Sequence, residues 1–402
     1  MFGPVFLALP LSAPLAIGTA SPFLQDEPVA PSAGAVEAEP DAEGESEAAD
    51  DAAPKKTSGS RFKDPTDGMF DLTLNFSKGG FVPIPFLITE PAVGFGGGAA
   101  ALFIHERNVE DPWYVEDTSA VNAPPNATVV MGAGTENGTW LAAVGHQGVW
   151  KDDTIRYMGA LATGQINLDL FVGDTGFGYG LETVVIFQDI RFRVGDTDLF
   201  LGANYRFASS EANFRDVPPE LFPAIEQNDA GAGLVAQWDT RDNYFTPHTG
   251  QDIELQGTFW NEAFGGDANF GAFQGKGRAY FPIADDHTLG VRVQVELAGD
   301  DAPFYLLPSI RLRGVPFARY QGTEVGSTEA EFRYAFTPRW EGLAFGGVGT
   351  ARDSVLPNSG AIWAGGLGFR YLLARPFGIS AGLDLAVGPE QGVIYIAVGS
   401  GL

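Results

Sequence analysis

Polar and apolar residues alternate strictly along two stretches of the chain, on either side of a long loop. In the first stretch, one face consists of aliphatic residues: Leu289, Val291, Val293, Val295 and Leu297. The second stretch, over 327–336, has the same period of two. Successive side chains of a strand point to opposite faces, so this period predicts two amphipathic strands. The basic loop between them, from Arg311 to Gly322, indicates a barrel wall that carries a functional loop.

The same alternation continues over most of the chain, interrupted by glycine and polar turn signals, and predicts about sixteen strands. They lie near residues 80–89, 93–106, 126–134, 138–149, 153–167, 176–193, 197–209, 228–240, 250–260, 267–282, 287–299, 326–337, 340–349, 361–373, 377–388 and 391–402. In the clearest strand, Ile253, Leu255 and Phe259 share a face opposite polar residues. So many one-sided strands favour an all-β transmembrane antiparallel barrel over a soluble sandwich.

The lengths of the connections agree with a barrel. If the first strand starts in the periplasm, short periplasmic turns fall at 152–153, 195–197, 284–286, 337–339 and 375–376. The longer connections, 209–227, 300–325 and 350–360, then fall on the extracellular side. One connection, 107–125, is long where a short turn is expected. Most tryptophans stand near strand ends, which is typical of an interfacial aromatic girdle.

Composition supports the same class of protein. Glycine is abundant at 53 of 402 residues, and charged residues make up only 19%, below the roughly 25% that is typical of soluble domains. No apolar run long enough for a transmembrane helix follows the N-terminus. A net charge of −27 argues against nucleic acid as a partner, because phosphates require Lys and Arg. The absence of cysteine excludes disulfides and thiolate metal sites.

The N-terminal part of the chain differs from the remainder in composition. Residues 1–20 combine an apolar core with a small-residue end and are interpreted as a signal peptide. Residues 21–60 are rich in Ala, Pro and acidic residues, and they cannot bury enough apolar surface to offset their chain entropy. They are expected to form a disordered acidic linker, and residues 61–402 to form the barrel domain.

Four segments are distinctive in sequence: PFLITEPAVGFGGGAAALF over 85–103, WDTRDNYFTPHTG over 238–250, GVPFARYQG over 314–322, and VIYIAVGSGL over 393–402. In this order they resemble four parts of the BamA/TamA group of outer-membrane proteins, also called the bacterial surface antigen barrel domain. Those parts are the first hairpin, the periplasmic turn after the eighth strand, the sixth extracellular loop with its VRG-aromatic motif, and the closing strand. The resemblance covers roughly residues 80–402.

This resemblance implies a sixteen-stranded barrel whose first and last strands pair weakly and form a lateral gate. Family members with N-terminal POTRA domains insert or translocate other proteins. Only about forty residues separate the expected signal peptide from the barrel, too few for a domain of that kind, so a POTRA-less barrel is expected. It should be a monomer in the bacterial outer membrane, in contact with outer-membrane lipid and with periplasmic or outer-membrane client proteins.

The resemblance also assigns a loop motif with partners in the lumen: Arg319, Tyr320, Gly322, Glu331 and Asp384. Arg319 aligns with the family's loop arginine, which folds into the lumen, and Glu331 matches its first acidic partner. Gly346 stands where the family usually has an aspartate, and Asp384 is a candidate substitute. A buried arginine without a carboxylate partner would be costly. The alternative is a solvated extracellular loop with an ordinary arginine.

The periplasmic turn of the resemblance contains four notable residues: Asp239, Arg241, Asp242 and Gly250. One interpretation is a small charged site. The other is a charged turn that stops a strand at the membrane surface, and turn chemistry explains each residue. The second interpretation is favoured.

Nothing in the sequence indicates catalysis or a cofactor. The histidines His105, His146, His248 and His287 have no companions at metal-ligand spacing, and no G-x-S-x-G elbow occurs. No catalytic, cofactor-binding or metal residue is therefore predicted, and the chain is not expected to be an enzyme.

Three functions remain open from sequence. The first is insertion or transport of protein or lipid through the barrel or its seam. The second is a passive porin-like channel, lined by residues such as Arg206, Glu254, Arg278, Arg292 and Glu331. The third is an outer-membrane enzyme or adhesin.

Overall fold

The structure is a computed structural model that describes residues 62–74, 80–88, 93–105, 124, 126–172, 175–214, 224–316, 319–352, 360–390, 392–399 and 401–402. The expected signal peptide over 1–20 and the expected linker over 21–60 lie outside the described residues, as does most of the connection 107–125. Among the described residues, no helix is long and apolar enough to cross a membrane.

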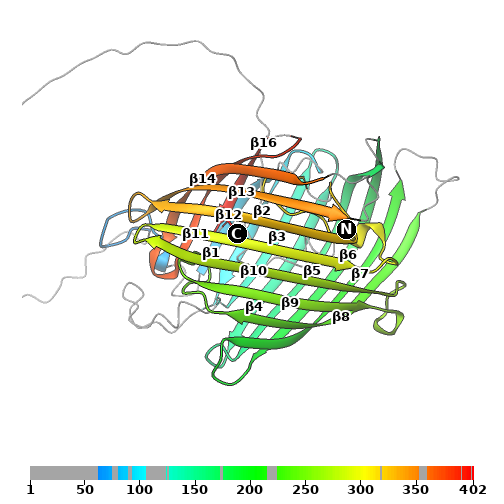
Figure 1. Cartoon of the computed structure of the whole chain (residues 1–402), viewed down its shortest axis with the longest axis horizontal. Helices are drawn as coiled ribbons and strands as arrows, with labels where there is room; N and C mark the ends of the chain where they lie inside the picture. Colours follow the sequence, from blue (N-terminus) through cyan, green and yellow to red (C-terminus); the bar gives the residue numbers. More distant parts are fainter. Residues whose placement is uncertain are drawn as a thin grey trace, which may run out of the picture.

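One 16-stranded sheet, ordered from β1 to β16, forms the molecule, and every strand is antiparallel to its neighbours in sequence. The sheet curls into a nearly closed barrel (Figure 1). Its strands are β1 (Gly80–Ile88), β2 (Gly96–Ile104), β3 (Ala127–Thr135), β4 (Trp140–Trp150), β5 (Ile155–Val172), β6 (Thr175–Arg193), β7 (Leu199–Phe214), β8 (Ile225–Asp239), β9 (Gly250–Trp260), β10 (Phe270–Ala284), β11 (His287–Ala298), β12 (Glu324–Ala335), β13 (Trp340–Arg352), β14 (Ile362–Ala374), β15 (Ile379–Val387) and β16 (Gly392–Val398). The predicted fold class and strand number are confirmed.

The antiparallel order places alternate connections at opposite ends of the barrel. We call the end with the connections after even-numbered strands the turn end, and the opposite end the loop end. Short turns join β10 to β11 and β12 to β13 at the turn end, whereas the long connection over 299–323 joins β11 to β12 at the loop end. Three short 3₁₀ helices interrupt connections: η1 (Glu262–Phe264), η2 (Phe304–Leu306) and η3 (Arg375–Phe377).

Alternation along the strands separates an apolar outer surface from a polar lumen. In β9, Leu255 and Phe259 are exposed on the outside, while Asp252 and Gln256 are buried inside. A lipid-facing apolar band around a polar interior is the pattern of transmembrane barrels. Trp260 departs from the expected aromatic girdle, because its position places it on the inner face of β9. There it is buried and stacks on Phe270, with ring centroids 5.6 Å apart.

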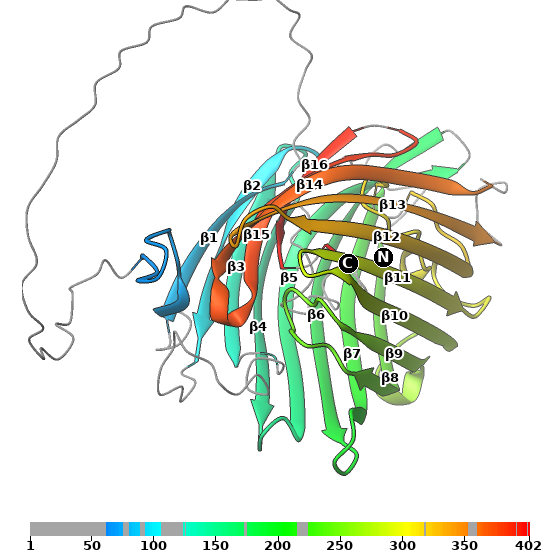
Figure 2. The ribbon, with the colours of Figure 1, turned by 60° about the vertical axis from the view of Figure 1, so that its left-hand side comes forward.

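The barrel has a seam between its first and last strands. β1 pairs with β2 and β16 with β15, and among the described residues β1 and β16 are not paired with each other. Ile396 of β16 and Ile84 of β1 instead both pack against the cluster that contains Phe86 and Ala100, and Figure 2 shows the two ends of the sheet near each other. Pro83 and Pro85 stand two positions apart in β1, so their backbone nitrogens point to the same edge of the strand. Proline nitrogens carry no hydrogen, which an edge strand without a partner tolerates.

Residues 62–74 precede β1 and form a clamp on the turn end (in blue in Figure 2). The guanidinium of Arg339, in the β12–β13 turn, lies 2.5 Å from Asp64, 2.6 Å from Asp67 and 2.6 Å from Asp71. The Leu72 amide also donates to the Leu373 carbonyl oxygen over 2.7 Å. Charge-assisted hydrogen bonds to one arginine hold the clamp. Since the clamp precedes β1, part of the expected barrel domain over 61–402 lies outside the strands.

Candidate functional site

The connection between β11 and β12 projects into the lumen and carries a buried arginine at its tip. Ser309 and Gln321 form an antiparallel bridge, so the chain between them runs out and back. The guanidinium of Arg313 lies 2.7 Å from Glu329 and 2.7 Å from Glu331, both on the inner face of β12. The arginine thus joins the loop to the barrel wall through two carboxylates.

Asp384 of β15 links the same arginine to the part of the wall next to β16. Its carboxylate lies 2.9 Å from Arg313 and 2.6 Å from Arg370 of β14, and it is fully buried. The guanidinium of Arg313 also stacks over the Phe345 ring, 3.6 Å from its centroid. Burial opposes the charge of Arg313, but the surrounding carboxylates outweigh it and raise its pKa, so the side chain stays charged.

The residue after the arginine must be glycine. Gly314 has φ +96°, a left-handed conformation that L side chains rarely adopt. The Gly314 amide donates to the Tyr395 hydroxyl of β16 over 2.9 Å. The Gly314 carbonyl oxygen packs closely on Gly388, since a Cβ on Gly388 would lie 2.0 Å from this oxygen. The Arg313–Gly314 pair therefore connects the loop to the strands that border the seam.

The structure corrects the assignment of the loop arginine. Arg319 lies 2.6 Å from Glu390, in the turn between β15 and β16, whereas the arginine beside Glu331 is Arg313. The Tyr320 hydroxyl donates to the same carboxylate over 3.1 Å. Gly322 packs closely on the backbone of Arg352, since a Cβ on Gly322 would lie 2.2 Å from the Arg352 carbonyl oxygen. Arg313, six residues earlier, projects into the lumen. The Arg313–Gly314 pair, whose glycine is the first residue of the compared segment, was the signal that sequence reasoning missed.

Gly346 is also not the position of a missing partner. It lies on the outer face of β13, while its neighbour Phe345 is buried inside under Arg313. Asp384, which was proposed as a substitute partner for Arg319, pairs with Arg313 and Arg370. The choice of Gly346 was one residue away from the inward-facing Phe345, and a shift of one residue moves a side chain to the opposite face of a strand.

The turn between β8 and β9 forms a second inward structure, which we call the plug (residues 240–249). The turn residues fix its shape: Arg241 lies 2.8 Å from Asp239, and Asp242 accepts hydrogen bonds from two backbone amides, those of His248 and Thr249. Gly250 has φ +91° at the start of β9. These contacts agree with turn chemistry, and the partners of the turn also lie at or near the turn end of the barrel. Arg241 is 5% exposed, because the turn folds into the barrel.

The plug crosses the lumen to the opposite wall. The Asn243 side chain donates to the Phe377 carbonyl oxygen over 3.1 Å, and the Thr246 hydroxyl donates to the Gly378 carbonyl oxygen over 2.6 Å. Arg333 of β12 donates to the Pro247 carbonyl oxygen. The turn of β8–β9 is therefore bound to the turn of β14–β15 and narrows the turn end of the lumen.

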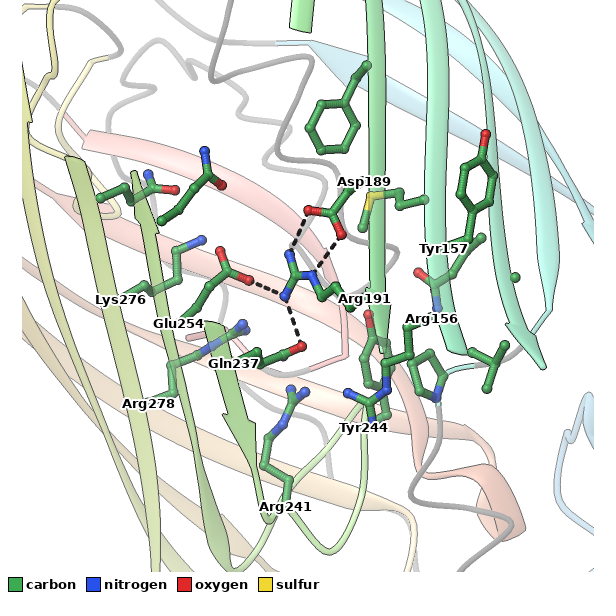
Figure 3. Close-up of a pocket in the computed structure, with 18 of the residues that line it drawn as sticks. Arg156, Tyr157, Asp189, Arg191, Gln237, Arg241, Tyr244, Glu254, Lys276 and Arg278 are labelled. Carbon is green, nitrogen blue, oxygen red and sulfur yellow. Dashed lines mark hydrogen bonds and ion pairs between the residues drawn. The ribbon is translucent and has the colours of Figure 1, made fainter. Parts of the chain in front are cut away.

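A cavity of about 100 Å³ lies in the lumen beside the plug, on the side of β4 to β10. Figure 3 shows Arg191 from one wall and Glu254 from the other pointing toward each other across it. Arg191 lies 2.7 Å from Asp189 and 2.6 Å from Glu254, and it also donates to Gln237. Side chains from strands that are not neighbours thus meet inside the barrel.

Part of the chain matches a known family model. Residues 176–306 match the Omp85 superfamily domain. The matched range runs from β6 to η2, so it contains the plug and the beginning of the loop that carries Arg313. No curated protein matches the chain.

Solved structures share the fold of the whole barrel. BamA from Haemophilus ducreyi lacking POTRA domains 1–3 is similar with a TM-score of 0.54 and 9% identity, over 80% of this chain and 70% of that one. CdiB from Escherichia coli has a TM-score of 0.55 and 12% identity, over 79% and 61%. CdiB from Acinetobacter baumannii has a TM-score of 0.53 and 9% identity, over 79% and 59%. The chain thus spans about three fifths of each CdiB chain, and at these identities the likeness shows the fold.

Proposed function

We propose that this chain is an outer-membrane β-barrel of the BamA/TamA type, as the match of residues 176–306 to the Omp85 superfamily domain supports, and that it inserts or transports client proteins at the outer membrane. The observation that carries the proposal is the seam. A client strand needs a sheet edge with free backbone groups, and only an unpaired edge offers them within a membrane. Among the described residues β1 and β16 are the two edge strands of the sheet, and β16, which contains no proline, offers the fuller row of backbone donors.

The lumen supports this function better than passive conduction. At the loop end, the segment around Arg313 is fixed to β12 and β15, and at the turn end the plug is bound to the turn of β14–β15. Both structures narrow the path along the barrel axis. The proposed route for a client therefore involves the seam, where side-chain packing of Ile396 replaces a hydrogen-bonded ladder.

The proposed partners follow from this route. Client proteins present a β-strand to the seam, and outer-membrane lipid contacts the apolar outer surface of the barrel, where residues such as Leu234 and Phe259 are exposed. The proposal assigns no catalysis to the chain, because strand exchange at a sheet edge exchanges hydrogen bonds and breaks no covalent bond.

Cysteine cross-linking across the seam tests the proposal, since the chain has no cysteine of its own. In the double variant Ile84→Cys/Ile396→Cys, the two thiols lie on either side of the seam. Proteoliposomes that contain this variant would be mixed with a small unfolded outer-membrane barrel, and folding of that client would be followed by its heat-modifiable gel mobility. We expect oxidation to stop the acceleration of client folding and reduction to restore it.

A matched pair within the wall controls for oxidation itself. Ala101→Cys/Val130→Cys joins β2 to β3, where the two residues are register partners. Cross-linking this pair should leave client folding unchanged. Full acceleration by the seam-locked barrel would refute the proposal.

A further inference from the structure

Cations dominate the lining of the cavity beside the plug (Figure 3). Two carboxylates, Asp189 and Glu254, line it together with six basic side chains: Arg156, Arg191, Arg206, Arg241, Lys276 and Arg278. Like charges held near one another disfavour the charged state unless counter-charges are close. Cations without such a carboxylate partner are therefore the ones that could bind an anion in the cavity.

Four of the six cations have a carboxylate within 4 Å. The closest pairs are Arg156 with Asp153 at 2.6 Å, Arg191 with Glu254 at 2.6 Å, Arg241 with Asp239 at 2.8 Å, and Arg278 with Asp252 at 2.7 Å. These four arginines are parts of the barrel's internal ion-pair network. Arg206 of β7 and Lys276 of β10 are the other two.

Neither of these two cations has an ion pair within the part of the chain that the structure describes. The Nε of Arg206 is buried without a hydrogen bond, and its guanidinium lies 5.5 Å from the centroid of the Phe187 ring. Lys276 is the register partner of Glu254. The carboxylate of Glu254, however, is bound to Arg191. The carboxylate nearest to Lys276 along the sheet is thus already engaged.

A third cation, in the loop between β11 and β12, acts electrostatically on both of them. Arg311 interacts electrostatically with both Arg206 and Lys276. Its nearest carboxylate, that of Glu296, is 3.8 Å away, and its Nε and Nη2 atoms have no hydrogen bond. Arg206 and Lys276 thus line the cavity, and Arg311, which is not one of its lining residues, adds positive charge and N–H donors without hydrogen bonds.

We propose that Arg206, Lys276 and Arg311 bind an oxyanion of the phosphate class inside the lumen. A guanidinium offers a planar fork of donors that matches phosphate oxygens, and an ammonium adds a compact charge. Gln256 and Gln274 line the same cavity, and each amide nitrogen uses one of its two hydrogens to donate to a neighbour, Thr258 and Glu296 respectively. Rings of Arg and Lys likewise mark anion and phosphate pores in membranes. This binding site is distinct from the seam and goes beyond protein insertion.

Direct binding of inorganic phosphate tests the site. The full chain, folded in detergent at low ionic strength, would be titrated with phosphate in a calorimeter. We expect saturable binding to the wild type, weakened about tenfold or more by Arg206→Gln and by Lys276→Gln, because each removes a charge-assisted hydrogen bond. Lys151→Gln, in the exposed β4–β5 turn, is the matched control and should bind like the wild type.

Equal affinity in all four proteins, or no binding to the wild type, would overturn the proposal. If either luminal variant does not fold, the wild type alone decides the matter. Ligands that bind the native state raise its melting temperature, so phosphate should raise it above the value in chloride at the same ionic strength. An identical melting temperature in both salts would also overturn the proposal.

A competition experiment identifies the source of the phosphate group. Dihexanoyl phosphatidic acid below its micellar concentration would be added to the phosphate-bound barrel. Displacement of phosphate supports a lipid headgroup as the ligand, and retention of phosphate supports a free anion. In both cases Arg206 and Lys276 bind the phosphate group. If Arg206→Gln and Lys276→Gln bind phosphate like the wild type, the site is refuted for either source.

Discussion

Asn243 and Phe377 are 134 positions apart in the chain, yet the side-chain amide of Asn243 donates to the backbone carbonyl oxygen of Phe377 over 3.1 Å. This bond runs across the lumen, from the β8–β9 turn to the β14–β15 turn. Gly378, next to Phe377, has φ +66° and packs where a Cβ would lie 2.6 Å from the Asn243 side chain. The bond therefore depends on the conformations of both turns, and it fixes the plug.

We predict that Asn243→Ala loosens the plug and increases the ion conductance of the barrel in planar bilayers. The substitution leaves the Phe377 carbonyl oxygen without this donor and removes the side chain that accepts the Phe245 and Thr246 amides. The loss should be about 1–3 kcal/mol of local stability, as for a buried polar group left unpaired. Asn269→Ala, in the exposed β9–β10 connection, should conduct like the wild type. Equal currents from all three proteins would show that the plug does not limit conductance.

Arg313→Ala should destabilise the folded barrel far more than Arg319→Ala. Removal of Arg313 leaves Glu329, Glu331 and Asp384 buried with less positive charge, and breaking a buried ion pair in this way costs about 3–5 kcal/mol. Arg319 forms a more exposed pair with Glu390, and such pairs contribute about 0–1 kcal/mol. Urea titrations of the heat-modifiable band would measure both effects. A larger loss in Arg319→Ala would reverse the assignment.

Arg339→Gln should release the clamp at the turn end. Its three carboxylate partners would lose their shared cation, so residues 62–74 should become accessible to protease while β2 to β15 remain protected. Arg375→Gln is the graded comparison, because Arg375 contacts only Asp64 among these acids, at 3.1 Å. Unchanged protection in Arg339→Gln would mean that backbone and apolar contacts suffice.

The plug should weaken in mild acid because of His248. Burial, together with the positive charge of Arg333, lowers the pKa of His248 below its usual 6.5. In this range the unfolded chain takes up a proton that the folded plug resists, so stability is lost as the pH falls from about 6.5 through the lower folded pKa. Conductance should rise over this interval, and His248→Gln should flatten the dependence. A flat profile in the wild type would contradict this mechanism.

The wall of the barrel could be predicted from the sequence because strand alternation is a local property. Whether Ile253 faces outward and Asp252 inward follows from a period of two and needs no knowledge of distant residues. The same reasoning predicted that Glu331 faces the lumen, and it is fully buried there.

The interior was harder to predict because its contacts are set by connections that fold back into the lumen. A turn such as 240–249 has the same sequence chemistry whether it lies at the membrane surface or inside the barrel. Its position depends on partners such as Phe377 and Arg333, which are distant in the chain. Likewise, either Arg313 or Arg319 could have reached Glu331, and the conformation of one loop decides between them.

The clamp has a mechanical consequence. Leu72 is bonded to Leu373 at the end of β14, and the clamp acids are held by Arg339 in the turn before β13. Tension on the chain upstream of residue 62 is therefore delivered to β12, β13 and β14, and it reaches β1 only after these bonds break. The first strand can move at the seam while the chain that precedes the clamp pulls on β12 to β14, which lie on the β16 side of the seam.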